Sequence, residues 1–300
     1  MDLLQKTQKI CQVNKIEPAR SKGQNFLIND SVYDEIIKSA NLKADDVVLE
    51  VGPGLGFLTR KLAEKAQKVI TVELDDVLAE LLKINLAKEK IANVEIRNEN
   101  ILDFNFTEKR EATVSLAPPG EGRCEGAFEL KKYKIVANIP YNITSVFLRK
   151  FLETNNRPEM MVLMLQKEVA ERIIAKPGQM SILAVSVQFF AEGEIICNVP
   201  AKDFWPAPRV DSAVIKLVAR EDNSIFTDLA YQKRFFRLVK HGFVSKRKML
   251  KNNLSAGYHV DQEKVIEVMD RVGLIKTARA QELSIEEWKK LLVEVEGNML

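Results

Sequence analysis

Cysteine and histidine are scarce in this chain of 300 residues, which contains three cysteines and two histidines. Cys11, Cys124 and Cys197 lie far apart and are odd in number, which argues against a disulfide framework and is typical of a reducing compartment. His241 and His259 belong to no Cys/His cluster with the spacing of zinc ligands. We therefore expect neither a metal centre nor a disulfide-stabilised secreted fold.

Long apolar runs are also missing. The most apolar run, Met160–Leu165, is far too short to span a bilayer, and the first twenty residues have no apolar signal-peptide core. With 46% hydrophobic and 29% charged residues and only 10 prolines and 13 glycines, the composition is that of a globular protein rather than a fibre or a disordered chain. We expect a soluble, cytoplasmic monomer with no membrane segment, built from one large or two medium domains.

Acidic residues are absent from residues 229–260, although the net charge of the whole chain is only +3. A segment this one-sided indicates a polyanionic partner such as RNA, with a solvated helix face as the alternative. The cations of this segment are Lys233, Arg234, Arg237, Lys240, Lys246, Arg247, Lys248 and Lys251.

What the chain does contain is an alternation of short β-branched runs with helical ones, the pattern that builds parallel sheets. Seven candidate strands in about 170 residues predict a single doubly wound, Rossmann-like α/β domain. The alternation breaks between Phe106 and Tyr133, where turn residues without periodicity predict an inserted loop at about 107–132. The candidate strands are Val47–Val51, Val69–Leu74, Val94–Arg97, Ile135–Asn138, Met161–Leu165, part of Val185–Ile196, and Ala213–Val218.

A polar linker at Arg220–Ser224 separates this region from a wholly helical one. We predict three parts: a polar, basic N-terminal arm at 1–21, an α/β domain at 22–219, and a small all-helical domain at 225–300. An earlier helix is predicted at Ser31–Ala40, and Ser284 with Glu287 forms a capping-box pattern. The helices predicted beyond the linker are Leu229–Val239, Lys246–Leu254, Asp261–Val272 and Ser284–Val295.

Residues 47–56 read as a strand that runs into a glycine-rich turn and then a helix. Gly52, Gly54 and Gly56 allow the backbone to approach a ligand closely, and Glu73, at the end of the next strand, can accept hydrogen bonds from both hydroxyls of a ribose. The third glycine of the dinucleotide fingerprint is replaced by Phe57, which favours S-adenosylmethionine over a pyrophosphate-containing cofactor. The plainer alternative is a tight turn followed by a solvent-facing glutamate.

The fourth strand ends in Asn138-Ile139-Pro140-Tyr141. An adenine amino group is a poor nucleophile because its lone pair is delocalised, so a site that methylates it must hold both N–H groups with hydrogen-bond acceptors. The Asn138 side-chain oxygen and the Ile139 carbonyl can do this in a turn that Pro140 stiffens, while Tyr141 offers a face for the flipped-out base. A second aromatic side chain, that of Phe204 or Trp205, is needed to close the pocket. The alternatives are that Asn138–Tyr141 is only a strand-end turn and that the proline-rich loop with Phe204 only caps the core.

At this point the sequence resembles one family, the small-subunit ribosomal RNA adenine-N6,N6-dimethyltransferases, over about residues 21–292. Each motif is moderately specific, and together, in this order, they are strong. The motifs are Gly23–Leu27, Glu50–Gly56, Asn138–Tyr141 followed by Asn142–Ser145, Leu165–Val169, Phe204–Ser212 and Ser245–Leu254.

The resemblance implies that Asn25 and Leu27 line the methionine end of S-adenosylmethionine beside Gly52, that Glu73 holds its ribose, and that Asn138 faces both cofactor and acceptor. It also implies a substrate: two adjacent adenosines in the loop of the 3′-terminal hairpin of 16S rRNA, each dimethylated within a nearly assembled small subunit. Lys233, Arg234, Lys246, Arg247, Lys248 and Lys251 are then expected to contact RNA phosphates.

Two departures from the family pattern stand out. Asn100 occupies the position where the family commonly has an acidic residue for the cofactor adenine, and an asparagine oxygen can accept the same bond more weakly. The insertion at about 107–132 is longer than the loop that the family has at this position. Three other functions stay open: an adenine-N6 methyltransferase acting on 23S rRNA or DNA, a non-catalytic rRNA-binding assembly factor, and an NAD-dependent oxidoreductase.

Overall fold

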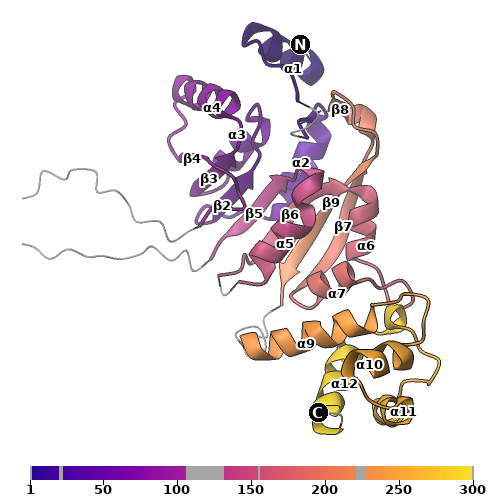
Figure 1. Cartoon of the computed structure of the whole chain (residues 1–300). Helices are drawn as coiled ribbons and strands as arrows, with labels where there is room; N and C mark the ends of the chain where they lie inside the picture. Colours follow the sequence, from indigo (N-terminus) through magenta and orange to yellow (C-terminus); the bar gives the residue numbers. More distant parts are fainter. Residues whose placement is uncertain (1, 20–22, 106–131, 155, 221–227, 299–300) are drawn as a thin grey trace, which may run out of the picture.

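A seven-stranded sheet forms the centre of the computed structural model, which describes residues 2–19, 23–105, 132–154, 156–220 and 228–298 (Figure 1). The strand order is β4-β3-β2-β5-β6-β9-β7. Neighbouring strands from β4 to β6 are parallel, whereas β9 is antiparallel to both β6 and β7. This arrangement confirms the predicted Rossmann-like fold, with a reversal of strand order between β2 and β5. The strands are β2 (Val47–Val51), β3 (Lys68–Glu73), β4 (Val94–Asn98), β5 (Lys134–Asn138), β6 (Met160–Gln166), β7 (Ala191–Val199) and β9 (Ser212–Ala219).

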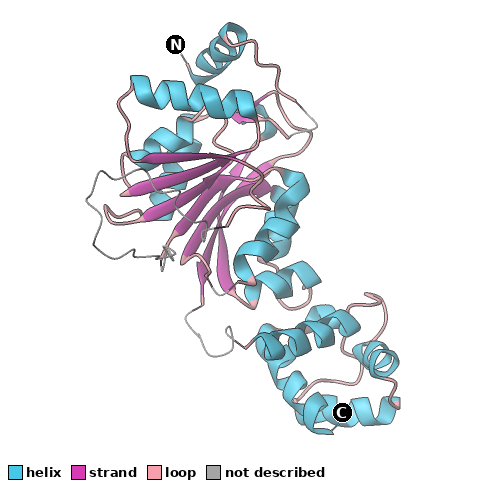
Figure 2. Cartoon of the chain, turned by 60° about the vertical axis from the view of Figure 1, so that its left-hand side comes forward, coloured by secondary structure: helices cyan, strands magenta, loops and turns pink. Residues whose placement is uncertain are grey.

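The central strands are apolar on both faces because helices cover both faces of the sheet (Figure 2). In β6, Val162 and Met164 pack in one hydrophobic cluster with side chains of α2 (Asp30–Ala40) and α3 (Phe57–Ala63). The alternate residues, such as Leu163, pack in a second cluster on the opposite face. The second cluster includes side chains of α5 (Thr144–Leu152), α6 (Lys167–Ile173) and α7 (Ile182–Gln188).

One apolar segment is divided between a helix and a strand. Within the segment Val185–Ile196, which was predicted to be partly strand, α7 continues to Gln188 and β7 begins only at Ala191. The Ser181 side chain accepts a hydrogen bond from the amide of Ala184 at 3.2 Å, so it caps the start of α7 and commits this apolar run to a helix. A short apolar run suits a buried helix as well as a strand, and periodicity alone does not separate the two.

The predicted N-terminal arm contains a helix that the sequence pattern did not reveal, α1 (Leu3–Val13). Leu3, Thr7 and Cys11 are buried on one face of this helix. A small second sheet lies nearby, in which β1 (Phe26–Leu27) pairs antiparallel with β8 (Phe204–Trp205). This pairing joins two segments that are almost 180 residues apart in the chain.

The C-terminal region is wholly helical, as predicted, and consists of α9 (Leu229–Gly242), α10 (Leu250–Tyr258), α11 (Gln262–Arg271) and α12 (Ile285–Asn298). The predicted start of the second of these helices, Lys246, is wrong, because α10 begins at Leu250. The Asn253 side chain, 4% exposed, donates hydrogen bonds to the carbonyls of Gly242 at 2.6 Å and Ser245 at 3.0 Å, which holds residues 243–249 in a turn. The capping box of Ser284 and Glu287 is confirmed by reciprocal hydrogen bonds.

Aromatic side chains join the helical region to the sheet domain. The ring centroid of Phe189, which follows α7, lies 4.4 Å from that of Phe235 and 5.3 Å from that of Phe236 in α9. These side chains belong to, or pack against, the same hydrophobic cluster that covers one face of the sheet. Most of the predicted insertion and most of the predicted linker lie outside the described residues, which omit 106–131 and 221–227.

Candidate active site

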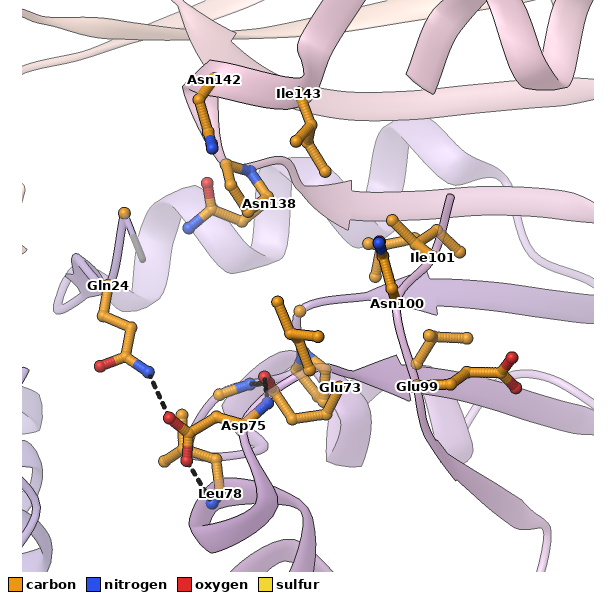
Figure 3. A pocket seen from close by; sticks show the side chains of 18 of the residues that line it. Gln24, Glu73, Asp75, Leu78, Glu99, Asn100, Ile101, Asn138, Asn142 and Ile143 are labelled. Atoms are coloured by element: carbon orange, nitrogen blue, oxygen red, sulfur yellow. Dashed lines mark hydrogen bonds between the residues drawn. The ribbon is translucent and has the colours of Figure 1, made fainter. Parts of the chain in front are cut away.

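A first pocket of about 310 Å³ lies at the carboxyl ends of the central strands, where the strand order reverses between β2 and β5 (Figure 3). Open α/β sheets bind ligands at this point because the connections on either side leave the strand ends uncovered. Five separate segments of the chain meet here. The lining residues lie within 23–26, 51–54, 72–78, 99–102 and 138–143.

The glycine turn after β2 forms one wall of the first pocket. Gly52, Gly54 and Gly56 have φ angles of +65°, +55° and +78°, which favour glycine. A Cβ atom added at Gly56 would lie 2.4 Å from Cδ1 of Leu82, and one added at Gly54 would lie 3.2 Å from the ring of Phe26. The turn therefore depends on glycine both for its backbone conformation and for its packing, and Gly52 and Gly54 line the pocket.

Glu73 ends β3 and directs its carboxylate towards the glycine turn. One carboxylate oxygen accepts from the amide of Gly54 at 3.1 Å, and the other accepts from the amide of Asp75 at 2.9 Å. Burial raises the pKa of Glu73, which is 7% exposed, while the backbone hydrogen bonds act in the opposite direction. Each oxygen keeps further accepting capacity, so the carboxylate can bind a pair of hydroxyl groups in the pocket.

Asn100 lines the first pocket, as expected from the position of the family's acidic residue. Its side-chain oxygen already accepts a hydrogen bond from the amide of Leu102 at 3.0 Å, which stabilises the turn after β4. Glu99 also lines the pocket, but its carboxylate points away from that of Glu73 (Figure 3). Asp103 is not among the lining residues, so Asn100 is the residue of this turn best placed to accept a hydrogen bond there.

The turn that follows β5 connects the first pocket to a second one. Asn138, at the end of β5, and Pro140 both line the first pocket. Ile139, whose residue surface is 1% exposed, lines neither pocket, and its amide donates to the carbonyl of Met164 at 3.2 Å. Within the described residues the carbonyl of Ile139 accepts no hydrogen bond.

Tyr141 lines a second pocket of about 540 Å³, whose other lining residues come from the N-terminal segment, the end of β6 and the loop before β9. Its hydroxyl group lies 2.7 Å from Oγ of Ser212, a fully buried residue, and this contact fixes the plane of the half-buried ring. Gly23, Asn25 and Asn142 line both pockets. The two pockets are therefore adjacent, and Asn138 lies near their junction.

Leu27 and Phe204, two predicted site residues, line neither pocket. They are partners in the small β1–β8 sheet and are buried, with 2% and 3% of their surfaces exposed. Because side chains alternate along a strand, Phe26 faces the first pocket while Leu27 faces the hydrophobic core. The expected positions of Leu27 beside the cofactor and of Phe204 over the base are thus not what this structure shows.

Several pocket residues were not predicted. Gln24 donates to the carboxylate of Asp75 at 3.1 Å and accepts from the amide of Ala19 at 2.8 Å, so it ties the N-terminal segment to the start of α4 (Asp76–Lys88). Gln166 and Arg209 line the second pocket. Asp75 carried a recognisable signal, an N-cap before an apolar-periodic helix, whereas Gln24, Gln166 and Arg209 carried none apart from the motifs that contain them.

The predicted RNA-binding cations fall into two groups, those without an ion pair among the described residues and one that is paired within the helical region. Lys246, Arg247 and Lys248 are exposed in the turn before α10 and form no ion pair among the described residues. Lys233 is exposed on α9 and Lys251 is half-buried at the start of α10. Arg234, in contrast, is paired with Glu296 of α12 and lies over the ring of Tyr231, so it is engaged within the helical region.

Two features are absent from the part of the chain that the structure describes. No cluster of three or more His, Cys, Asp or Glu side chains there could hold a metal ion. None of the helices in the same residues is long and apolar enough to cross a membrane.

Residues 17–295 match the family model described as ribosomal RNA adenine dimethylase. The chain is 38% identical over 283 residues to a ribosomal RNA small subunit methyltransferase A from Dehalococcoides mccartyi (strain CBDB1), covering 94% of this chain and 90% of that protein. It is 35% identical to the protein of the same name from Alkaliphilus metalliredigens, covering 97% and 96% of the two chains.

Two solved structures are similar over nearly the whole chain. A dimethyladenosine transferase from Plasmodium falciparum superposes with a TM-score of 0.74 at 27% identity, covering 92% of this chain and 98% of that one. The 23S rRNA methyltransferase ErmE superposes with a TM-score of 0.69 at 28% identity, covering 91% and 100%. The similarity therefore extends over the helical region, and it is shared with a dimethyladenosine transferase and with a 23S rRNA methyltransferase.

Proposed function

The chain belongs to the ribosomal RNA adenine dimethylase family, and from this we propose that it dimethylates N6 of two adjacent adenosines in the 3′-terminal hairpin loop of 16S rRNA. It is a ribosomal RNA adenine dimethyltransferase. The observation that carries the proposal is that Asn138 lies where a nucleotide-sized pocket meets the pocket of Tyr141. The residues assigned to donor, acceptor and RNA below are part of the same proposal.

The first pocket fits S-adenosylmethionine, which when bound supplies a methyl group activated by its sulfonium. Glu73 presents a buried carboxylate with free accepting capacity, which suits the two ribose hydroxyls. Asn100, which lines this pocket, would accept from the adenine amino group. Gly52, Gly54 and Asn25 line the remaining wall, where the amino-acid end would lie.

The second pocket would hold the acceptor adenine. Asn138 and the carbonyl of Ile139 accept the two N6 hydrogens, which turns the nitrogen lone pair towards the first pocket. Tyr141, held by Ser212, stacks against the base, and Pro140 keeps the turn rigid. No proton need be removed before transfer; the proton that N6 loses after methylation passes to solvent. Orientation of the two reactants supplies most of the rate enhancement.

The helical region, residues 225–300, would bind RNA by its exposed cations. Residues 22–219 would form the catalytic domain, which follows the N-terminal arm at 1–21. Lys246, Arg247 and Lys248 have no ion-pair partner among the described residues, and Asn253 clamps the turn that carries them. Lys233 and Lys251 belong to the same basic segment. Arg234 is the least suited of these cations to contact RNA phosphates, because Glu296 already pairs with it. We propose that the protein acts as a cytoplasmic monomer on the assembling small subunit.

The second candidate function is methylation of 23S rRNA, which the similarity to ErmE favours. The relatives named small-subunit methyltransferases are more similar in sequence, at 35–38% identity against 28%. A non-catalytic assembly factor is opposed by the complete Asn138–Tyr141 turn. An NAD-dependent oxidoreductase is opposed by Phe57, which replaces the third glycine of the dinucleotide fingerprint and packs, partly buried, against the core.

The test is incubation of the purified protein with labelled S-adenosylmethionine and one of three acceptors: unmethylated small subunits, 23S rRNA or duplex DNA. We expect label only on the small-subunit RNA, and digestion of that RNA should yield N6,N6-dimethyladenosine. Label only on 23S rRNA or DNA would overturn the substrate assignment. No label on any acceptor, together with retained binding to small subunits, would support the assembly factor instead.

A further inference from the structure

Gln166 lies in the second pocket, at the last position of β6. It is the register partner of Ser212 in β9, and Ser212 is the residue whose hydroxyl holds Tyr141. Gln166 is half-buried, so part of its surface faces the pocket and part is covered by the protein. Its position beside the fixed stacking ring makes it part of the wall against which an acceptor base would rest.

The amide group of Gln166 has no structural use among the described residues. Gln166 is the N-cap residue of α6, yet its side chain forms no capping hydrogen bond. N-caps are normally serine, threonine, aspartate or asparagine, whose short side chains turn back onto the helix. A glutamine side chain at this position extends further, and here it reaches the pocket with two donor hydrogens and one acceptor oxygen unused.

The other polar side chains of the second pocket are occupied or suited to other tasks. Tyr141 is bonded to Ser212, and the Asn25 amide donates to the carbonyl of Gly23 at 3.3 Å. Asn142 is exposed and also lines the first pocket, and Arg209 is an exposed cation at the rim that suits a phosphate. Among the described residues, Gln166 is therefore the uncharged polar side chain that lines the second pocket alone and forms no hydrogen bond.

We infer that Gln166 donates a hydrogen bond to a ring nitrogen of the acceptor adenine and so selects and orients that base. This inference rests on the proposed function, in which Asn138 and Ile139 occupy both N6 hydrogens. The ring nitrogens N1, N3 and N7 then remain as acceptors only, and a glutamine NH₂ is a matching donor. A hydrogen bond between neutral groups contributes about 0.5–1.5 kcal/mol, which corresponds to about a 2- to 12-fold change in kcat/KM.

The test pairs variants of Gln166 with altered acceptor bases. Small subunits are reconstituted with a ligated 3′ hairpin that carries adenosine, 1-deazaadenosine, 3-deazaadenosine or 7-deazaadenosine at both acceptor positions. Wild type, Gln166→Ala and the near-isosteric Gln166→Met are compared by kcat/KM on each substrate. Gln179→Ala, at an exposed glutamine outside both pockets, is the matched control.

We expect wild type and the control to lose about 2- to 12-fold on one of the three deaza substrates. Both Gln166 variants should show a similar loss on adenosine and no further loss on that deaza substrate. Equal losses on every deaza substrate in wild type and in both variants, or undiminished kcat/KM in the variants on adenosine, would overturn the role of Gln166. Failure of the wild type on unmodified adenosine would instead refute the proposed function.

Discussion

Replacement of Glu50 by glutamine tests the electrostatics beneath the glycine turn. Glu50 lies in β2 and is 1% exposed, and within the described residues neither of its oxygens forms a hydrogen bond. Burial raises the pKa of Glu50 to about 8; nearby Thr59 and Thr71 lower it somewhat, although their hydroxyls do not reach hydrogen-bonding geometry. The carboxyl group is therefore protonated in the folded protein at neutral pH.

The sign of the pH dependence follows from this raised pKa. Above pH 4.5 the unfolded chain releases the proton that the folded protein keeps, so the free energy of unfolding falls as pH rises and levels off above about pH 8. The slope is about 1.4 kcal/mol per pH unit, which gives a loss of about 3 kcal/mol between pH 4.5 and pH 7. A glutamine at position 50 is neutral throughout and escapes this loss.

The measurement is urea-induced unfolding of wild type and Glu50→Gln from pH 4.5 to pH 8, followed by circular dichroism. The variant should gain about 3 kcal/mol relative to wild type between pH 4.5 and pH 7, whatever offset separates them at the lower pH. Glu64→Gln, at the exposed residue that follows α3, should show no such trend. A difference between Glu50→Gln and wild type that does not change with pH would refute the reasoning.

Three further predictions concern the two pockets. Asn138→Ala should reduce turnover by about 100-fold or more because the acceptor nitrogen loses its orientation, while titration still detects S-adenosylmethionine binding; unchanged turnover would contradict the acceptor site. Glu73→Ala should weaken cofactor binding by about 10- to 150-fold, measured by calorimetry, through loss of charge-assisted hydrogen bonds; an unaltered Kd would remove Glu73 from the ribose site. Tyr141→Ala should lower kcat/KM by about 5- to 150-fold, whereas Tyr141→Phe keeps the stacking face and loses much less; equal losses in both would exclude stacking.

The strands were predictable because β-branched runs and helix signals are local properties. The predicted strand at Val47–Val51 matches β2, and that at Met161–Leu165 lies within one residue of β6 at each end. Val185–Ile196 was predicted as strand only in part, because helix and strand signals coincide in this short apolar run. Its helical part is decided by the cap at Ser181 and by packing against α9.

The candidate site was only partly predictable, because a motif identifies a segment but not the direction of each side chain. Asn25 and Leu27 belong to one motif, yet strand alternation and the pairing of Leu27 with Phe204 place Leu27 in the core. Arg234 looked like a free cation because its partner, Glu296, lies 62 residues further along the chain. Charge patterning detects neighbours in sequence and misses such partners.

The sequence alone determined the class of fold, the glycine turn and the polar turn after β5, since each depends on residues close together in the chain. Gly52, Gly54 and Gly56 have positive φ angles that favour glycine, and their spacing directly after a strand is visible in the sequence. Only the tertiary structure decided that Gly23 and Asn25 meet Asn142 across more than a hundred residues, so that two pockets share a wall. The tertiary structure also decided that Gln166 lines the second pocket. Its pairing with Ser212 and the absence of a capping bond from its side chain depend on how β6, β9 and α6 pack together.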